Sequence, residues 1–86
     1  MVTFDPVKAR SNLRKHGVHF SDCLAVLDDP NGHTKEDWAK GEQRFITLGM
    51  GGDGSILVVT WTDRHRQVRI ISARKASAGE ARHYGN

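Results

Sequence analysis

The side chains in this sequence with the clearest chemical potential are the cations near its end, Arg64, Arg69, Arg74 and Lys75. A guanidinium fork matches the oxygens of a phosphate group and keeps its charge at any physiological pH. Several such groups on one surface would hold an RNA backbone and stabilise negative charge that develops on phosphorus. The structural alternative is that they pair with carboxylates such as Glu80, or are simply solvated.

Proton transfer is the second chemical requirement for cutting RNA. Without a metal, one group must take the 2′-hydroxyl proton and another must protonate the leaving 5′-oxygen, and histidine is suited to both tasks. The candidates are His16, His65 and the carboxylate of Glu80. For His16 the alternative is a helix end, where a cation suits the dipole. His16 and His19 have the spacing of a metal pair, but no Cys or carboxylate cluster accompanies them, so no metal or other cofactor is expected.

Two aromatic side chains have the type needed to stack on unpaired bases, Trp61 and Tyr84. Trp61 lies in an apolar strand, which is more typical of a core residue. Tyr84 is compatible with either a base contact or a structural role.

Charge is concentrated in the last third of the chain. Residues 56–86 carry six Lys/Arg and two Asp/Glu, whereas residues 1–55 carry seven and eight, and the net charge is +3. A basic region in a small protein indicates a polyanionic partner, usually nucleic acid, or a solvated surface. The single cysteine excludes an internal disulfide and suits a reducing cytoplasm, where we expect the protein. No apolar run is long enough to predict a membrane span.

The first half of the sequence predicts two helices. Asp5-Pro6 has the N-cap and first-position residues of a helix that ends near His16, because Gly17 suits the left-handed position after it. A second helix is expected from Ser21 until Pro30 stops it. The polar stretch NGHTKEDWAKGE that follows is expected to be a loop, with at most a short strand at 33–37.

The second half predicts strands and a short closing helix. RFITLGM is expected to be a strand. ILVVTWT and QVRIISARK are rich in β-branched residues and form a hairpin around DRHR. If that loop is symmetric, Thr60 lies opposite Arg69, and Arg74 shares a sheet face with Trp61. Ser77 and Glu80 have the spacing of a capping box for a helix in the tail.

These elements predict one α+β domain over residues 1–86. Two N-terminal helices pack on one face of a three- to five-stranded, mainly antiparallel sheet, and a short helix closes the chain. The opposite face of the sheet is expected to be shallow and lined by basic residues from the strand ends.

Several stretches together resemble the BrnT family, the small ribonuclease toxins of type II toxin–antitoxin systems. They are FDPVKARSNLRKHGVHF, GEQRFITLG, VVTWTDRHRQVRIISARKA and EARHY, and the similarity extends from Phe4 to Tyr84. The resemblance implies a RelE-like fold and an endoribonuclease that blocks translation. It also implies a BrnA antitoxin with a ribbon-helix-helix DNA-binding domain, in a complex with two copies of each chain that represses its own operon.

The resemblance places the family's patterned polar residues at matching positions that include Lys8, Asn12, Lys15, His16, Arg44, Arg64, Arg69, Ser72, Arg74 and Lys75. Our hypothesis assigns catalytic roles to Arg64, Arg74, His16 and Glu80, and RNA-binding roles to Lys8, Lys15, Arg44, Arg69, Lys75 and Tyr84. The working hypothesis is metal-independent in-line attack of the 2′-oxygen, with Arg64 and Arg74 stabilising one phosphorane. One departure is Ser77-Ala78-Gly79, where relatives usually carry a basic stretch. Two rival hypotheses remain: a non-catalytic module that binds RNA or a partner, and a scaffold for an antitoxin.

Overall fold

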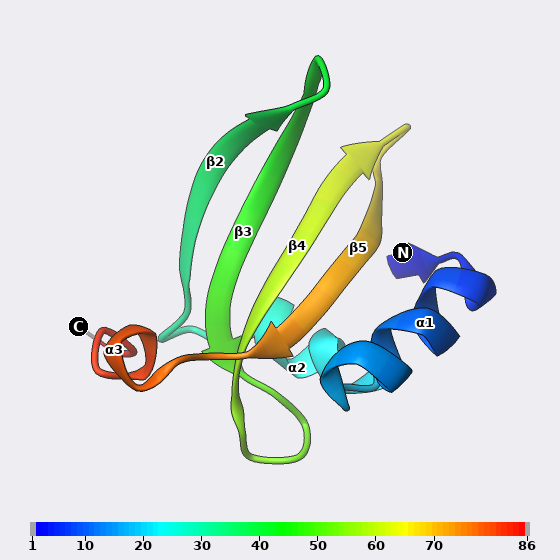
Figure 1. Cartoon of the computed structure of the whole chain (residues 1–86). Helices are drawn as coiled ribbons and strands as arrows, with labels where there is room; N and C mark the ends of the chain where they lie inside the picture. The colour runs from blue at the N-terminus through cyan, green and yellow to red at the C-terminus, as the bar shows by residue number, and fades with distance from the viewer. Residues whose placement is uncertain (1, 86) are drawn as a thin grey trace.

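A five-stranded sheet in the order β1-β5-β4-β3-β2 forms the centre of the structure, a computed structural model that describes residues 2–85 (Figure 1). The strands are β1 (Val2–Phe4), β2 (His33–Ala39), β3 (Glu42–Met50), β4 (Ile56–Arg64) and β5 (Gln67–Lys75). Strand β1 runs parallel to β5, and every other neighbouring pair is antiparallel. The expected α+β class is confirmed, but the sheet is mixed.

Helix α1 (Pro6–His16) begins and ends where the sequence predicts. The Asp5 side chain accepts a hydrogen bond from the backbone N–H of Val7 at 2.8 Å, and Gly17 adopts the left-handed conformation with φ 69°. The second expected helix is shorter than predicted. A 3₁₀ turn, η1 (Phe20–Asp22), leads into α2 (Cys23–Leu27), which ends three residues before Pro30. The capping box of α3 (Ala78–Ala81) is present in both halves, as expected.

Strand β2 corrects the expectation of a loop over residues 31–42. It pairs along its whole length with β3, and Lys40 and Gly41 join the two strands with φ values of 53° and 73°. Two central residues with positive φ are typical of the tight type I′ hairpin turn. Because β2 is an edge strand with almost every side chain exposed, its sequence carries no alternation of apolar and polar residues.

The core lies between one face of the sheet and the two N-terminal helical segments. Leu57, Val59, Ile70 and Ala73 from the sheet pack against a group from the segment that follows α1, namely Val18, Phe20, Cys23 and Val26. We call the opposite face the open face, because among residues 2–85 only α3 and the tail after it lie over it, at one end (Figure 1). No helix within residues 2–85 is long and apolar enough to cross a membrane.

The register of the β4–β5 hairpin differs from the expected one. Its turn contains only His65 and Arg66, both with positive φ, so Arg64 pairs with Gln67 and remains in the strand. Ile71 is an extra residue of β5, a β-bulge that shifts the pairing. The expected pairs are therefore wrong.

The bulge also changes the face on which the basic residue at the end of β5 lies. Thr60 pairs with Ser72 and Val58 pairs with Arg74, whereas Trp61 pairs with Ile70. Side chains alternate between faces along each strand. Arg74 consequently lies on the open face with Val58, and not on the core face with Trp61.

Candidate functional site

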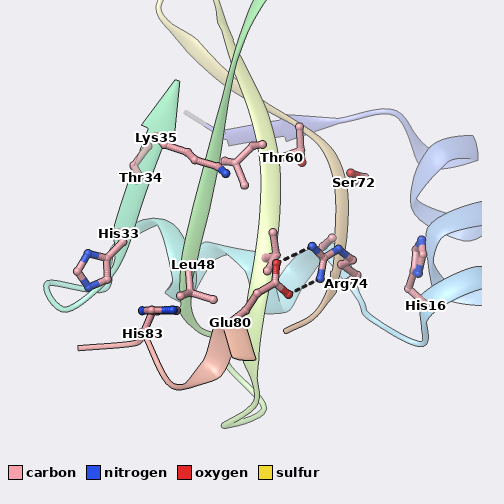
Figure 2. Close-up of a pocket in the computed structure, with 13 residues that line it drawn as sticks. His16, His33, Thr34, Lys35, Leu48, Thr60, Ser72, Arg74, Glu80 and His83 are labelled. Atoms are coloured by element: carbon pink, nitrogen blue, oxygen red, sulfur yellow. Dashed lines mark hydrogen bonds and ion pairs between the residues drawn. The ribbon is translucent and has the colours of Figure 1, made fainter. Parts of the chain in front are cut away.

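The open face contains a cavity of about 520 Å³ at the end nearest α3 (Figure 2). Strands β2 to β5 form its floor, His16 at the end of α1 forms one side, and the tail forms another. The lining side chains include His16, His33, Lys35, Ile46, Leu48, Val58, Thr60, Ser72, Arg74, Glu80 and His83. This volume lies within the range of small-ligand pockets.

A second, smaller hollow of about 200 Å³ runs beside α1. Its lining residues are Lys8, Ser11, Asn12, Lys15, His16, Ile71 and Ser72. Because His16 and Ser72 line both spaces, the two adjoin, and we call the combined feature the groove. The groove thus extends from Lys8 and Lys15 of α1, past His16 and Ser72, to Arg74.

Asn12 fixes α1 beside the end of β5. It is buried, with 6% of its surface exposed, and its side-chain amide donates to the carbonyl of Ala73 at 2.8 Å. Its carbonyl oxygen accepts from the N–H of Ala73 at 3.0 Å, and the amide also lies 3.3 Å from the carbonyl of Val18. Strand β1 pairs only with residues 68–70 of β5, so Asn12 satisfies backbone groups that no strand reaches. This places His16, one turn later, near Arg74.

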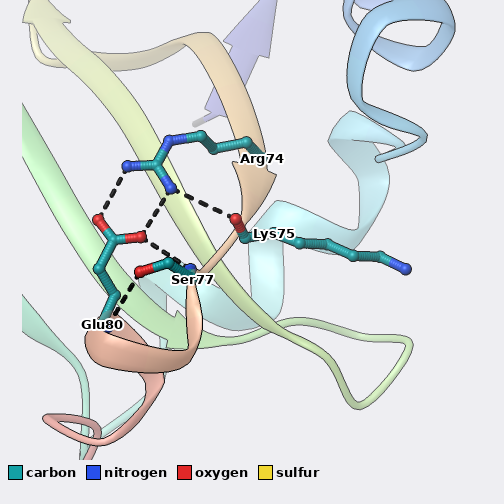
Figure 3. A network of polar contacts seen from close by, with 4 residues as sticks. All are labelled: Arg74, Lys75, Ser77 and Glu80. Atoms are coloured by element: carbon teal, nitrogen blue, oxygen red, sulfur yellow. Dashed lines mark hydrogen bonds and ion pairs between the residues drawn. The ribbon is translucent and has the colours of Figure 1, made fainter.

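Arg74 is held by Glu80 in a two-pronged ion pair (Figure 3). Its Nη1 and Nη2 atoms donate to the two carboxylate oxygens at 2.7 and 2.8 Å, and Nη1 also lies 3.3 Å from the carbonyl of Lys75. The carboxylate in turn accepts from the backbone N–H of Ser77 at 2.9 Å. These donors, first of all Arg74, lower the pKa of Glu80 from 4.5 to about 2. Glu80 is therefore a fixed anion near neutral pH.

Lys75 does not join this group. It pairs with Leu57 of the core face, and its side chain extends away from Arg74 (Figure 3). The expectation that the cations at the end of β5 share one surface is thus wrong for Lys75.

The other three candidate arginines, Arg44, Arg64 and Arg69, lie on the open face but beyond the cavity. Arg64 donates from Nη2 to Glu42 at 2.8 Å, and Arg44 lies 3.6 Å from the same carboxylate. Arg69 pairs with Thr62, two residues along β4 from the cavity residue Thr60. These three form a basic extension of the groove toward the hairpin tip.

Arg64 and Arg74 lie at opposite ends of the β4–β5 hairpin. Arg74 pairs with Val58 and Arg64 lies six residues further along β4, which corresponds to about 20 Å of strand. This separation counts against the hypothesis that both stabilise one phosphorane, which stays a prediction. His65, in the hairpin turn, lies at the same distant end.

Tyr84 anchors the tail instead of presenting a free ring edge. Its hydroxyl donates to the carboxylate of Asp29, which also accepts from the backbone N–H groups of Met50 at 2.8 Å and Asn31 at 2.9 Å. The hydrogen bond lowers the pKa of Asp29 and raises that of Tyr84. With Glu80 bound to Arg74, the tail is tied down on both sides of His83.

The structure also adds side chains to which the sequence interpretation assigned no role in the site. His33 and Lys35 reach the cavity from β2, and His83 reaches it from the tail (Figure 2). His33 and Lys35 belong to the stretch interpreted as a loop, so no pattern in the sequence linked them to Arg74. Within residues 2–85, no three His, Cys, Asp or Glu side chains are grouped as a metal site.

Comparisons with known proteins identify the family. The model of the family described as the ribonuclease toxin, BrnT, of type II toxin–antitoxin systems matches residues 4–80. The crystal structure of the Brucella abortus ribonuclease toxin BrnT is similar, with a TM-score of 0.66 and 25% sequence identity over 88% of this chain and 95% of that one. No curated protein matches at a significant level. Because the family model matches nearly the whole length and the solved structure shares the fold, this chain belongs to the BrnT family of ribonuclease toxins of type II toxin–antitoxin systems.

Proposed function

We propose that this protein is an endoribonuclease toxin that cuts RNA without a metal ion and thereby inhibits translation. The observation that carries the proposal is that His16 and Arg74 line the same cavity, at the segment where the two parts of the groove meet. A cation for the phosphate and an imidazole for proton transfer are the two functions that metal-free cleavage requires.

The scissile phosphate binds at Arg74 in this proposal. The 2′-oxygen attacks phosphorus as His16 takes its proton, and the bond to the 5′-oxygen breaks as that oxygen takes a proton from solvent water. The products carry a 2′,3′-cyclic phosphate and a 5′-hydroxyl. Arg74 is 46% exposed, and exposed ion pairs are weakly held, so a phosphate can share or displace the carboxylate of Glu80. A carboxyl group with a pKa of about 2 is a poor proton donor or acceptor at neutral pH. We therefore assign Glu80 to positioning Arg74.

The flanking RNA follows the groove. Lys8 and Lys15 line its α1 end and hold phosphates on one side of the cut. The basic extension formed by Arg44, Arg64 and Arg69 holds more distant phosphates. Lys75, on the core face, is left out of the RNA path.

Membership of the family supports an antitoxin partner. The partner we propose is a BrnA-like ribbon-helix-helix protein, bound as a complex with two copies of each chain that recognises operator DNA through the antitoxin. Covering the groove would exclude RNA and so neutralise the toxin.

The direct test is cleavage of a short RNA by the purified protein in excess EDTA. We expect products with cyclic phosphate and 5′-hydroxyl ends, identified by mass spectrometry, and no cut at a position whose 2′-hydroxyl is replaced by hydrogen. Arg74→Ala should reduce kcat by 10²-fold or more, as expected for loss of one charge-stabilising donor. Arg66→Ala, at the exposed hairpin tip, is the matched control. Activity that EDTA abolishes, or that survives the 2′-deoxy replacement, would reject this mechanism.

A second candidate is a module that binds RNA or a partner without cutting. It is favoured by one observation, that Arg64 and Arg74 are both paired with carboxylates of this chain. Salt-sensitive RNA binding with no product after prolonged incubation would establish this alternative.

A further inference from the structure

One half of the cavity has a chemistry that neither phosphate binding nor proton transfer requires. On the side away from His16, the floor is formed by the aliphatic side chains of Ile46, Leu48 and Val58. The imidazoles of His33 and His83 lie at its edge, on the side opposite His16 (Figure 2). An apolar floor flanked by flat rings is unnecessary for holding a sugar–phosphate backbone.

We propose that this half of the cavity is a subsite for one nucleobase, next to the scissile phosphate. The proposal rests on the function proposed above and adds to it the part of the substrate that the cavity recognises. Single-stranded RNA is recognised through unstacked bases that pack on flat or apolar side chains and present their edges to polar groups.

The subsite adjoins the phosphate position directly. Val58, in its floor, is the pairing partner of Arg74, so a phosphate at Arg74 lies beside the apolar surface. Lys35 and the hydroxyl of Thr60 line the same cavity and can reach the polar edge of a base. Leu48 pairs with His33 across β2 and β3, which joins the floor to one flanking ring.

The tail fixes the backbone that carries the other ring. Glu80 binds Arg74 and Tyr84 binds Asp29, and His83 lies between these two attachments. Because the backbone at His83 is already fixed, less chain freedom is lost when a base packs against its ring, which favours binding. The short C-terminal segment thereby becomes part of substrate recognition.

The test compares RNA trimers that differ by one missing base on either side of the cut. The trimers carry 2′-O-methyl groups, which resist cleavage, and binding is followed by fluorescence anisotropy. Removing the base on one side of the cut should weaken binding by about 5- to 150-fold, the range for stacking of a single base. In the double variant His33→Ala/His83→Ala, the same removal should change binding by less than about 3-fold. His19→Ala, an exposed histidine outside the cavity, should retain the full penalty.

Cleavage of the matching unmodified trimers tests the ribonuclease function separately from the base subsite. The wild-type protein could fail to cleave any trimer and still bind more weakly when a base is removed. That result would reject the ribonuclease mechanism and retain the subsite. Equal binding of trimers with and without each base by the wild-type protein, or an unchanged penalty in the double variant, would overturn the subsite. Circular dichroism melting confirms that the double variant is folded.

Discussion

The side chain of Asn12 occupies the edge of β5 at Ala73, donating to its carbonyl at 2.8 Å and accepting from its N–H at 3.0 Å. A single amide thus takes the place of a neighbouring strand beyond the end of β1. Ala73 is flanked by Ser72 and Arg74, which line the cavity, and His16 follows Asn12 by one helical turn. The relative position of the two groups proposed to act on RNA therefore depends on one buried side chain.

Replacing Asn12 by Ala should destabilise the protein by about 2–3 kcal/mol, since it leaves the N–H and C=O of Ala73 without their partner in a buried position. Urea unfolding followed by tryptophan fluorescence measures this change. Gln67→Ala removes an exposed amide of similar chemistry and serves as the control. A loss for Asn12→Ala no larger than that of the control would contradict the assignment.

The carboxyl group of Glu80 should titrate far below its ordinary range. Its pKa is lowered to about 2 in the folded protein, so the stabilisation it provides is complete above about pH 4.5 and is lost as the pH falls toward 2. NMR titration of the side-chain carboxyl should give a midpoint near 2. Glu80→Gln should remove this part of the pH dependence of thermal unfolding, and Glu36→Gln on the exposed edge strand should not. A midpoint near 4.5 would mean that the ion pair is not formed in solution.

Proton transfer and positioning can be separated by comparing two variants. Loss of a general acid or base costs 10²- to 10⁴-fold in rate, which we expect in kcat for His16→Ala. Glu80→Gln should lower kcat by less than about 10-fold, because Gln can still accept hydrogen bonds from Arg74. His19→Ala is the matched histidine control. A larger loss for Glu80→Gln than for His16→Ala would reverse the two assignments.

Arg64 and Arg74 should differ in which kinetic constant they control. Because they are separated by about 20 Å along the hairpin, Arg64→Ala should raise KM and reduce the salt dependence of binding, with kcat nearly unchanged. Arg74→Ala should lower kcat. Steady-state kinetics at two salt concentrations distinguishes these effects. Equal losses of kcat in both variants would show that the two side chains act on the same step.

The single thiol should report on unfolding. Burial raises the pKa of Cys23 to about 12, and the charges of Asp22 and Asp53 add to the effect, so the group is a protonated, enclosed thiol at pH 8. The thiolate is the reactive form. A disulfide reagent at pH 8 should therefore label the native protein only as fast as it unfolds, and completely in urea. Rapid labelling without denaturant would show that the helical layer opens locally.

The sequence predicted the elements whose signals are local. The limits of α1 follow from Asp5, Pro6 and Gly17, and the capping box of α3 follows from Ser77 and Glu80, because each motif uses backbone groups within a few residues. The basic residues of the groove were found for a similar reason, since charge and residue type are visible without a fold.

What was missed depends on partners distant in the sequence. Strand β2 is exposed along its length, so only its pairing with β3 makes it a strand. The tight turn at His65 and Arg66 has positive φ values that are more typical of Asn and Gly. The residue types therefore did not indicate that the turn has only two residues. His33 and His83 come together only when β2 and the tail meet over the sheet.

The extra residue at Ile71 shifts by one position the alternation of β5 side chains between the two faces of the sheet. Ile70 and Ala73 both face the helices although three positions separate them, and this offset is what turns the guanidinium of Arg74 outward. Deleting Ile71 would rotate every following side chain by half a turn and bury the cation against apolar neighbours. In an alignment of relatives, a gap placed at this position would compare inward residues with outward ones, so the two sides of the bulge are best aligned separately.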